Sequence, residues 1–140
     1  MIKQLTVFIE NRKGSLTRVT KLIKDAGINI ISFSLADTEN YGLLRMMVSN
    51  PDKAYSILKE NEMSASLTDV TAVDIDNEPG QLHKLLSLIE DFDIQYMYVF
   101  SNRDDYSGVI LKITDKEAAE KVIVENGFEL ISKEFFGFDN

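Results

Sequence analysis

The sequence lacks cysteine and contains a single histidine, His83. The absence of cysteine excludes disulfide bonds, thiolate nucleophiles and cysteine-ligated zinc or iron–sulfur sites, and one histidine excludes a multi-histidine metal site. No apolar run approaches the ~20 residues of a membrane-spanning helix. Met1 leads directly into a strand-like pattern rather than a signal peptide. The sequence therefore predicts a soluble, cytoplasmic protein that holds no metal or cofactor.

Basic residues are also scarce. Lysine and arginine number 15 against 23 aspartates and glutamates, which gives a formal charge of −8 over 140 residues. Nucleic-acid affinity depends largely on cationic side chains that neutralise phosphates, and attachment to an anionic membrane surface has the same requirement. The charge balance therefore argues against both kinds of partner.

What the sequence does contain is an internal repeat. Asn11, Gly14 and Leu16 recur 66 positions later as Asn77, Gly80 and Leu82. The same ungapped offset aligns Val7 with Val73, Ile28 with Ile94 and Gly42 with Gly108. A register that extends over this length is hard to obtain by chance, so the chain is predicted to contain two copies of one small unit.

Each copy shows the hydrophobic pattern of the element order βαββαβ. The first copy is predicted to contain a strand at 5–9, a helix at 16–26, strands at 28–35 and 43–48, a helix beginning at Pro51 and a last strand at 64–67. The corresponding elements of the second copy are a strand at 73–75, a helix at 82–89, strands at 94–100 and 109–113, a helix around 118–123 and a last strand at 128–135.

This order predicts an α+β fold with two ferredoxin-like units in tandem, each an antiparallel sheet with two helices on one face. The two domains comprise residues 1–67 and 68–140. A unit of ~65 residues is only marginally stable alone, and no linker rich in glycine, serine or proline separates the copies. We therefore expect the units to pack rigidly, with sheet edge against sheet edge.

Two short segments resemble the ACT domain, a small regulatory module that senses amino acids. These are residues 10–16 and 76–82, each between the first strand and the first helix of its copy. The family hallmark at this place is Asp or Asn, then Pro-Gly, then an aliphatic residue. The second copy carries it as Pro79-Gly80-Gln81-Leu82, whereas the first has Lys13 where proline is usual. The resemblance covers essentially the whole chain, with no catalytic domain attached.

The resemblance also implies a ligand site. Residues 26–30 are similar to the second strand of the serine-binding ACT domain of phosphoglycerate dehydrogenases, where one asparagine of the loop and one of this strand hold the ligand across a domain–domain interface. The matching positions are Asn11 and Asn29, with Asn77 and Gln95 in the second copy. The remaining implied contacts are Arg12, Lys13, Gly14, Ser15 and Leu16 in the first loop and Pro79, Gly80, Gln81 and Leu82 in the second.

The chemistry of the two junctions suits a free amino acid irrespective of family. The first N–H groups of a helix are unpaired and carry partial positive charge, which attracts a carboxylate. A glycine lets the backbone turn sharply and lets a ligand approach closely, and asparagine amides accept from an ammonium group. Structural roles stay open beside this one: tight turns for Gly14 and Gly80, helix caps for Asn11 and Asn77, and water-facing strand positions for Asn29 and Gln95.

The two junctions differ in charge. Arg12 and Lys13 flank the first, whereas Asp76 and Glu78 flank the second. A carboxylate is attracted by the former pair and repelled by the latter. The first junction is therefore predicted to bind an amino acid more tightly.

The predicted function is regulatory rather than enzymatic. The chain would bind a small amino acid effector at a domain interface and change its assembly, as a homodimer, or its hold on a regulated enzyme. A subunit that has lost its ligand, with a structural or partner-binding role, stays an alternative because Lys13 departs from the hallmark. An acylphosphatase-like hydrolase would need a cationic phosphate clamp and a paired nucleophile and base, which the acidic sequence does not offer.

Overall fold

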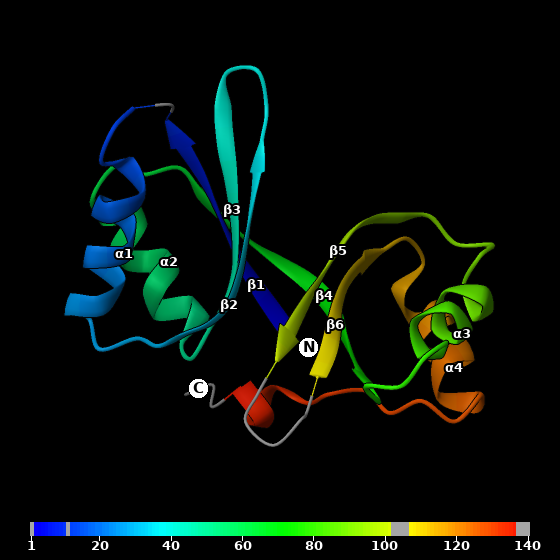
Figure 1. Ribbon diagram of the computed structural model, residues 1–140. Coiled ribbons are helices and arrows are strands. Elements are labelled where there is room, and N and C mark those ends of the chain that lie inside the picture. Colours follow the sequence, from blue (N-terminus) through cyan, green and yellow to red (C-terminus); the bar gives the residue numbers. More distant parts are fainter. Residues whose placement is uncertain (1, 11, 102–106, 137–140) are drawn as a thin grey trace. The chain divides into compact units, whose positions relative to one another are not determined.

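The computed structural model describes residues 2–10, 12–101 and 107–136, which form two compact units (Figure 1). The N-terminal unit is built around Lys3–Thr68 and the C-terminal unit around Asp69–Ser132. The boundary expected between residues 67 and 68 lies inside β4 (Ala65–Ile75), one continuous strand that runs from the first unit into the second. The predicted strands at 64–67 and 73–75 therefore belong to a single strand.

The N-terminal unit is an antiparallel sheet with two helices. Its elements are β1 (Ile2–Glu10), α1 (Ser15–Asp25), β2 (Ile30–Asp37), β3 (Tyr41–Val48) and α2 (Pro51–Glu60), followed by β4. The strands lie in the order β2-β3-β1-β4, and Val7 of β1 is paired with Leu44 of β3. The two helices lie side by side (Figure 1).

In the described residues the C-terminal unit repeats this arrangement without the last strand. After β4 come α3 (Gln81–Leu88), β5 (Ile94–Ser101), β6 (Ser107–Ile113) and α4 (Lys116–Glu125). The strands lie in the order β4-β6-β5 with antiparallel pairing, and α3 lies beside α4 (Figure 1). The α+β class and the two ferredoxin-like units predicted from the sequence are confirmed.

Each unit has a hydrophobic core of its own. Leu58 of α2 and Ile123 of α4 occupy matching positions, and both are 0% exposed. Alternation along the strands and the i, i+4 spacing along the helices direct apolar side chains to one face of each element, where burial stabilises the unit. No helix of the described residues combines the length and apolar character needed to cross a membrane.

The predicted last strand at 128–135 is wrong. Among the described residues of this segment, Leu130 forms one isolated bridge with Val73, and Lys133–Phe136 forms a short 3-10 helix, η1. The prediction rested on apolar residues at both ends of the segment. Lys133 and Glu134 interrupt the apolar–polar alternation that a longer strand requires.

The ungapped register between the copies also needs correction. It holds through the first helix of each unit, since Ile23 and Ile89, 66 positions apart, are both buried in their cores. The connections after the two helices differ. After α1 the Ile28 amide donates to the Ile23 carbonyl, five residues earlier, at 3.2 Å. After α3 the Phe92 amide donates to the Ile89 carbonyl, three residues earlier, at 3.0 Å. The second connection is two residues shorter, so β2 and β5 match at an offset of 64 instead of 66. The second hairpin is one residue longer, so the offset is 65 from β3 and β6 onward.

The displaced register changes one predicted site position. Asn29 exchanges backbone contacts with Ser49, whose amide donates to the Asn29 carbonyl at 2.9 Å, and Thr114 makes the same bond to Asp93 at 3.0 Å. Asn29 therefore corresponds to Asp93, and its assignment to Gln95 is wrong. The alignment of Ile28 with Ile94 fails for the same reason. The alignment of Gly42 with Gly108 fails because the sheet register matches Gly108 with Leu43.

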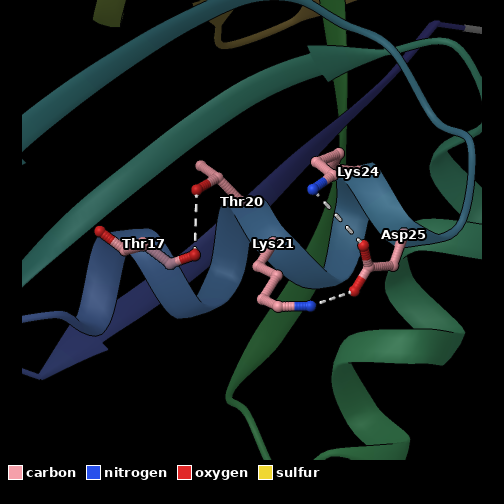
Figure 2. A network of polar contacts seen from close by, with 5 residues as sticks. All are labelled: Thr17, Thr20, Lys21, Lys24 and Asp25. Atoms are coloured by element: carbon pink, nitrogen blue, oxygen red, sulfur yellow. Dashed lines mark hydrogen bonds and ion pairs between the residues drawn. The ribbon is translucent and has the colours of Figure 1, made fainter.

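The outer face of α1 carries a polar network (Figure 2). Lys21 donates to Asp25 at 2.6 Å, one helical turn away, and Lys24 lies 3.9 Å from the same carboxylate. The hydrogen bond from Lys21 lowers the pKa of Asp25, and the charges of both lysines act in the same direction. The Thr20 hydroxyl donates to the Thr17 carbonyl at 3.1 Å. This face is solvated, and the opposite face supplies the core.

Candidate functional site

The first strand–helix junction has the same backbone geometry in both units. Gly14 precedes α1 with φ 85° and Gly80 precedes α3 with φ 86°, both in the left-handed region that favours glycine. The Arg18 amide donates to the Gly14 carbonyl at 3.0 Å, and the Lys84 amide donates to the Gly80 carbonyl at 2.9 Å. The 66-residue repeat therefore reproduces this junction in three dimensions.

The starts of α1 and α3 share a second feature, the absence of a side-chain cap among the described residues. Gly14 and Gly80 occupy the N-cap positions. In α2, by contrast, the Asn50 side chain accepts from the Lys53 amide at 3.1 Å. The first turns of α1 and α3 also lack acidic residues. The Ser15 and Gln81 amides donate to the Arg12 and Glu78 carbonyls at 3.3 Å. The next N–H groups of each first turn are therefore the ones available to an anion.

The structure tests the helix-cap role that the sequence leaves open for Asn77. Asn77 is exposed and does not cap α3, because Gly80 holds the N-cap position. The cap role suggested for Asn77 is therefore wrong. Asn11 lies outside the described residues.

A groove of about 590 Å³ lies on one side of the first junction. We call it the Gly14 groove; its lining comprises Ile9, Glu10, Arg12, Lys13, Gly14, Leu16, Thr17, Leu35, Ala36, Asp37 and Gly42. A Cβ built on Gly14 would meet no atom within 4 Å, so the space over the glycine is open. The structure thus brings Arg12, Lys13, Gly14 and Leu16 of the predicted site to one groove.

Two charged side chains of this groove, Lys13 and Asp37, form no ion pair among the described residues. Arg12 forms an ion pair with Glu10, which offsets much of its field. Lys13 is exposed. It lies directly before Gly14 and so adds positive charge at the helix start, where a carboxylate would bind.

A second groove of about 510 Å³ shares Arg12 and includes Ser15. We call it the Phe8 groove; it is lined by Phe8, Ile9, Glu10, Arg12, Ser15, Arg18, Val19, Tyr41, Glu62, Met63 and Ser64. Phe8 and Tyr41 form an edge-to-face pair with ring centroids 5.5 Å apart. Arg18 donates from its guanidinium to the Asn61 carbonyl at 3.4 Å. The first unit therefore has an aromatic wall and a cation in one depression.

Sequence reasoning missed the Phe8 groove. One signal for it was available: Phe8 is the apolar residue that breaks the alternation of β1, and the structure leaves it 40% exposed. Tyr41, Arg18 and Glu62 carried no such signal, because three different elements bring them together.

The C-terminal unit has a matching groove of about 420 Å³, which we call the Asp74 groove. It is lined by Asp74, Asp76, Gln81, Lys84, Asn126, Gly127, Phe128 and Glu129. The Phe8 amide donates to the Ser64 carbonyl at 3.0 Å, and the Asp74 amide donates to the Glu129 carbonyl at 2.9 Å, so the two grooves occupy the same place. Of the predicted residues only Gln81 lines it; Asn77, Pro79, Gly80 and Leu82 are exposed outside its lining.

The structure does not bring Asn29 or Gln95 to the junction of its own unit. Asn29 precedes β2, where its amide donates to the Ser49 hydroxyl at 2.9 Å, whereas the Gly14 groove takes Asp37 from the other end of that strand. A strand of eight residues spans about 25 Å. Gln95 is exposed on β5. A shared site for Asn11 and Asn29 across a domain–domain interface stays a prediction.

A family model described as an ACT domain pair matches residues 1–136. The crystal structure of protein BT0572 from Bacteroides thetaiotaomicron is similar in sequence and fold, with 34% identity and a TM-score of 0.90 over 97% of this chain and 95% of that one. Among curated proteins, none matches the chain.

Aspartate kinase structures share the fold at lower identity. The ligand-free regulatory subunit of aspartate kinase from Thermus thermophilus is 16% identical, with a TM-score of 0.63 over 88% of this chain and 90% of that one. A structure of aspartokinase alpha and beta subunits is 17% identical, with a TM-score of 0.60 and the same shares of both chains. At this identity the likeness concerns the fold.

Proposed function

The chain belongs to the ACT domain pair family, and on this premise we propose that it is a regulatory protein that binds a small free amino acid. The proposal places the main site at the Gly14 groove. It does not include catalysis, and the protein would act in the cytoplasm through a change in its assembly, as a homodimer, or in its hold on a regulated enzyme.

One observation carries this proposal: an uncapped helix start that opens into a groove. The first N–H groups of α1 have no side-chain partner in the described residues, and the space over Gly14 is open. A carboxylate there would accept from the backbone and would be attracted by Lys13. Asn11, beside the junction in sequence, would accept from the ammonium group.

The two junctions should differ in affinity. Asp76 and Glu78 flank Gly80 and form no ion pair in the part of the chain that the structure describes. Their charges oppose a carboxylate at the start of α3. We therefore propose that an amino acid binds the first junction more tightly than the second.

Thermal unfolding against each of the common amino acids tests this function. A ligand present at ~100 times its dissociation constant stabilises the folded protein by about 2.7 kcal/mol, which raises Tm by several degrees. At least one small amino acid should produce this shift. Asn11→Ala should reduce it far more than its matched control, Asn77→Ala.

Two results would count against the proposal. A panel in which no amino acid changes Tm would favour the ligand-free subunit, the alternative that Lys13 in the first hallmark suggests. Equal losses in the two asparagine variants, or a larger loss in Asn77→Ala, would remove the asymmetry between the junctions.

A further inference from the structure

The Phe8 groove contains an apolar surface that the core does not use. Phe8 is 40% exposed and Tyr41 39% exposed, although their rings contact each other at a centroid distance of 5.5 Å and an interplanar angle of 60°. At about 510 Å³ the groove lies within the range of small-molecule pockets, roughly 300–1,000 Å³. It can therefore hold an apolar group of limited size.

A cation and an anion lie close together in the same groove. The Arg18 guanidinium contacts the Asn61 carbonyl at 3.4 Å, a long bond that leaves most of its five N–H donors for another acceptor. Glu62, the residue after Asn61, also lines the groove, and its carboxylate forms no ion pair among the described residues. Neighbouring charges of opposite sign complement a zwitterion, in which carboxylate and ammonium share one carbon.

The backbone at Glu62 supports a role for its side chain. Glu62 has φ 62°, a left-handed conformation that is unfavourable for residues with a Cβ. The matching position of the C-terminal unit is Gly127, with φ 93°, which adopts the conformation without strain. Retained strain of this kind is concentrated at functional positions.

The Asp74 groove has a different arrangement of charged and aromatic side chains. Asp74 stands where the first unit has Phe8, Gly127 where it has Glu62, and Lys84 where it has Arg18. Lys84 lies over the Phe128 ring, 5.6 Å from its centroid, and is thus already engaged. The ring in the Asp74 groove, Phe128, is only 9% exposed, and one lysine there faces three carboxylates. The exposed aromatic pair and the combination of Arg18 with Glu62 are found in the Phe8 groove.

We infer that the Phe8 groove is a second ligand site, distinct from the Gly14 groove, which binds a free amino acid with an aromatic or branched aliphatic side chain. Arg18 binds the carboxylate, Glu62 binds the ammonium group, and Phe8 with Tyr41 contacts the side chain. This inference extends the proposed function to a second class of amino acid, and it can hold or fail separately.

Isothermal titration of the full chain with L-phenylalanine and L-leucine provides the test. The variants Phe8→Asp, Arg18→Lys and Glu62→Gly each introduce the residue found at the same place in the other unit, so they are compatible with the fold. Each should weaken binding about 10- to 100-fold, the loss expected for a charged hydrogen bond or an aromatic contact. Lys84→Ala, the matched control, should leave binding unchanged.

Two further readouts separate a binding role from a structural one. Glu62→Gly should raise Tm while it weakens binding, because it removes the left-handed strain. 3-Phenylpropanoate, which lacks the ammonium group, and 2-phenylethylamine, which lacks the carboxylate, should both bind more weakly than L-phenylalanine. Equal binding of 3-phenylpropanoate and L-phenylalanine would overturn the role of Glu62 and the zwitterion assignment.

The outcomes distinguish this inference from the proposed function. If small amino acids bind and Asn11→Ala weakens them, but neither L-phenylalanine nor L-leucine depends on Arg18 and Phe8, the second site is refuted and the first stands. If L-phenylalanine binds through Arg18 while no small amino acid binds the Gly14 groove, the reverse holds. If no amino acid binds, both fail.

Discussion

The two units of this chain share their buried parts and differ in their exposed ones. Leu58 and Ile123 fill the same core position at 0% exposure, and Gly14 and Gly80 adopt φ values of 85° and 86°. In the matching grooves, however, Phe8 is replaced by Asp74 and the charges change. The fold constrains the core and the turn, while the exposed lining has diverged, and this divergence is what makes two unequal sites possible.

The sheets of the two units also differ at one cross-strand pair. In the C-terminal unit Phe100 of β5 is paired with Gly108 of β6, whereas the matching pair in the N-terminal unit is Ala36 and Leu43. The large residue has moved from one strand to its neighbour. Phe100 is buried, whereas Ala36 and Leu43 are half-buried.

The largest expected effect concerns the shared core. Leu58→Ala and Ile123→Ala each remove a fully buried side chain, and each should lower the free energy of unfolding by about 2–5 kcal/mol. Native-state hydrogen exchange in each unit measures the two losses separately. If the losses in free energy of unfolding for the two variants differed by more than about 3 kcal/mol, the width of the range for core truncations, the two cores would not be equivalent.

The glycines of the two hairpins should respond differently to alanine. A Cβ on Gly108 would lie 2.4 Å from the Phe100 ring and 2.9 Å from Ile131, so Gly108→Ala should destabilise the protein by about 1–3 kcal/mol. On Gly42 the nearest atom is the end of the Leu35 side chain at 3.3 Å, which can move. Urea denaturation of Gly42→Ala, the control, should show little change; a larger loss there than in Gly108→Ala would be inconsistent with this packing.

The smallest effect is electrostatic. The hydrogen bond from Lys21 lowers the pKa of Asp25 in the folded protein. The ionised carboxylate therefore stabilises the fold at pH values above the pKa of Asp25 in the unfolded chain, ~3.9, and this stabilisation is lost as the pH falls through the lower pKa of the folded state. In the C-terminal unit Ser87 stands at the lysine position and donates to the His83 carbonyl. Lys21→Ser should raise the pKa of Asp25 in an NMR titration, with Lys13→Ser as control. An unchanged value would show that the ion pair does not persist in solution.

The repeat and the glycines could be predicted from the sequence because each has a local physical cause. Gly14 and Gly80 recur at turns that only glycine adopts without strain, and the apolar periodicity of α1 and β1 follows from burial on one face. The order of elements followed from these local patterns, with the exception of the last strand. That segment depends on tertiary contacts, and only one bridge, Val73 with Leu130, forms there.

The site could be predicted only in part. Arg12, Lys13 and Gly14 line one groove because they are consecutive in one loop. The assignment of Gln95 is wrong because the connection after α3 is two residues shorter than the one after α1, and an ungapped alignment cannot represent this difference in length. Arg18 and Glu62 could not be paired from the sequence, since a helix and a distant loop bring them together.

An NMR titration that follows the backbone amides of Gly14 and Gly80 during addition of single amino acids tests the account most directly. At least one small amino acid should shift the Gly14 amide resonance in a saturable way and shift the Gly80 amide resonance less. If no amino acid moves the Gly14 amide, or if the Gly80 amide alone responds, the assignment of the first junction as the regulatory site is contradicted.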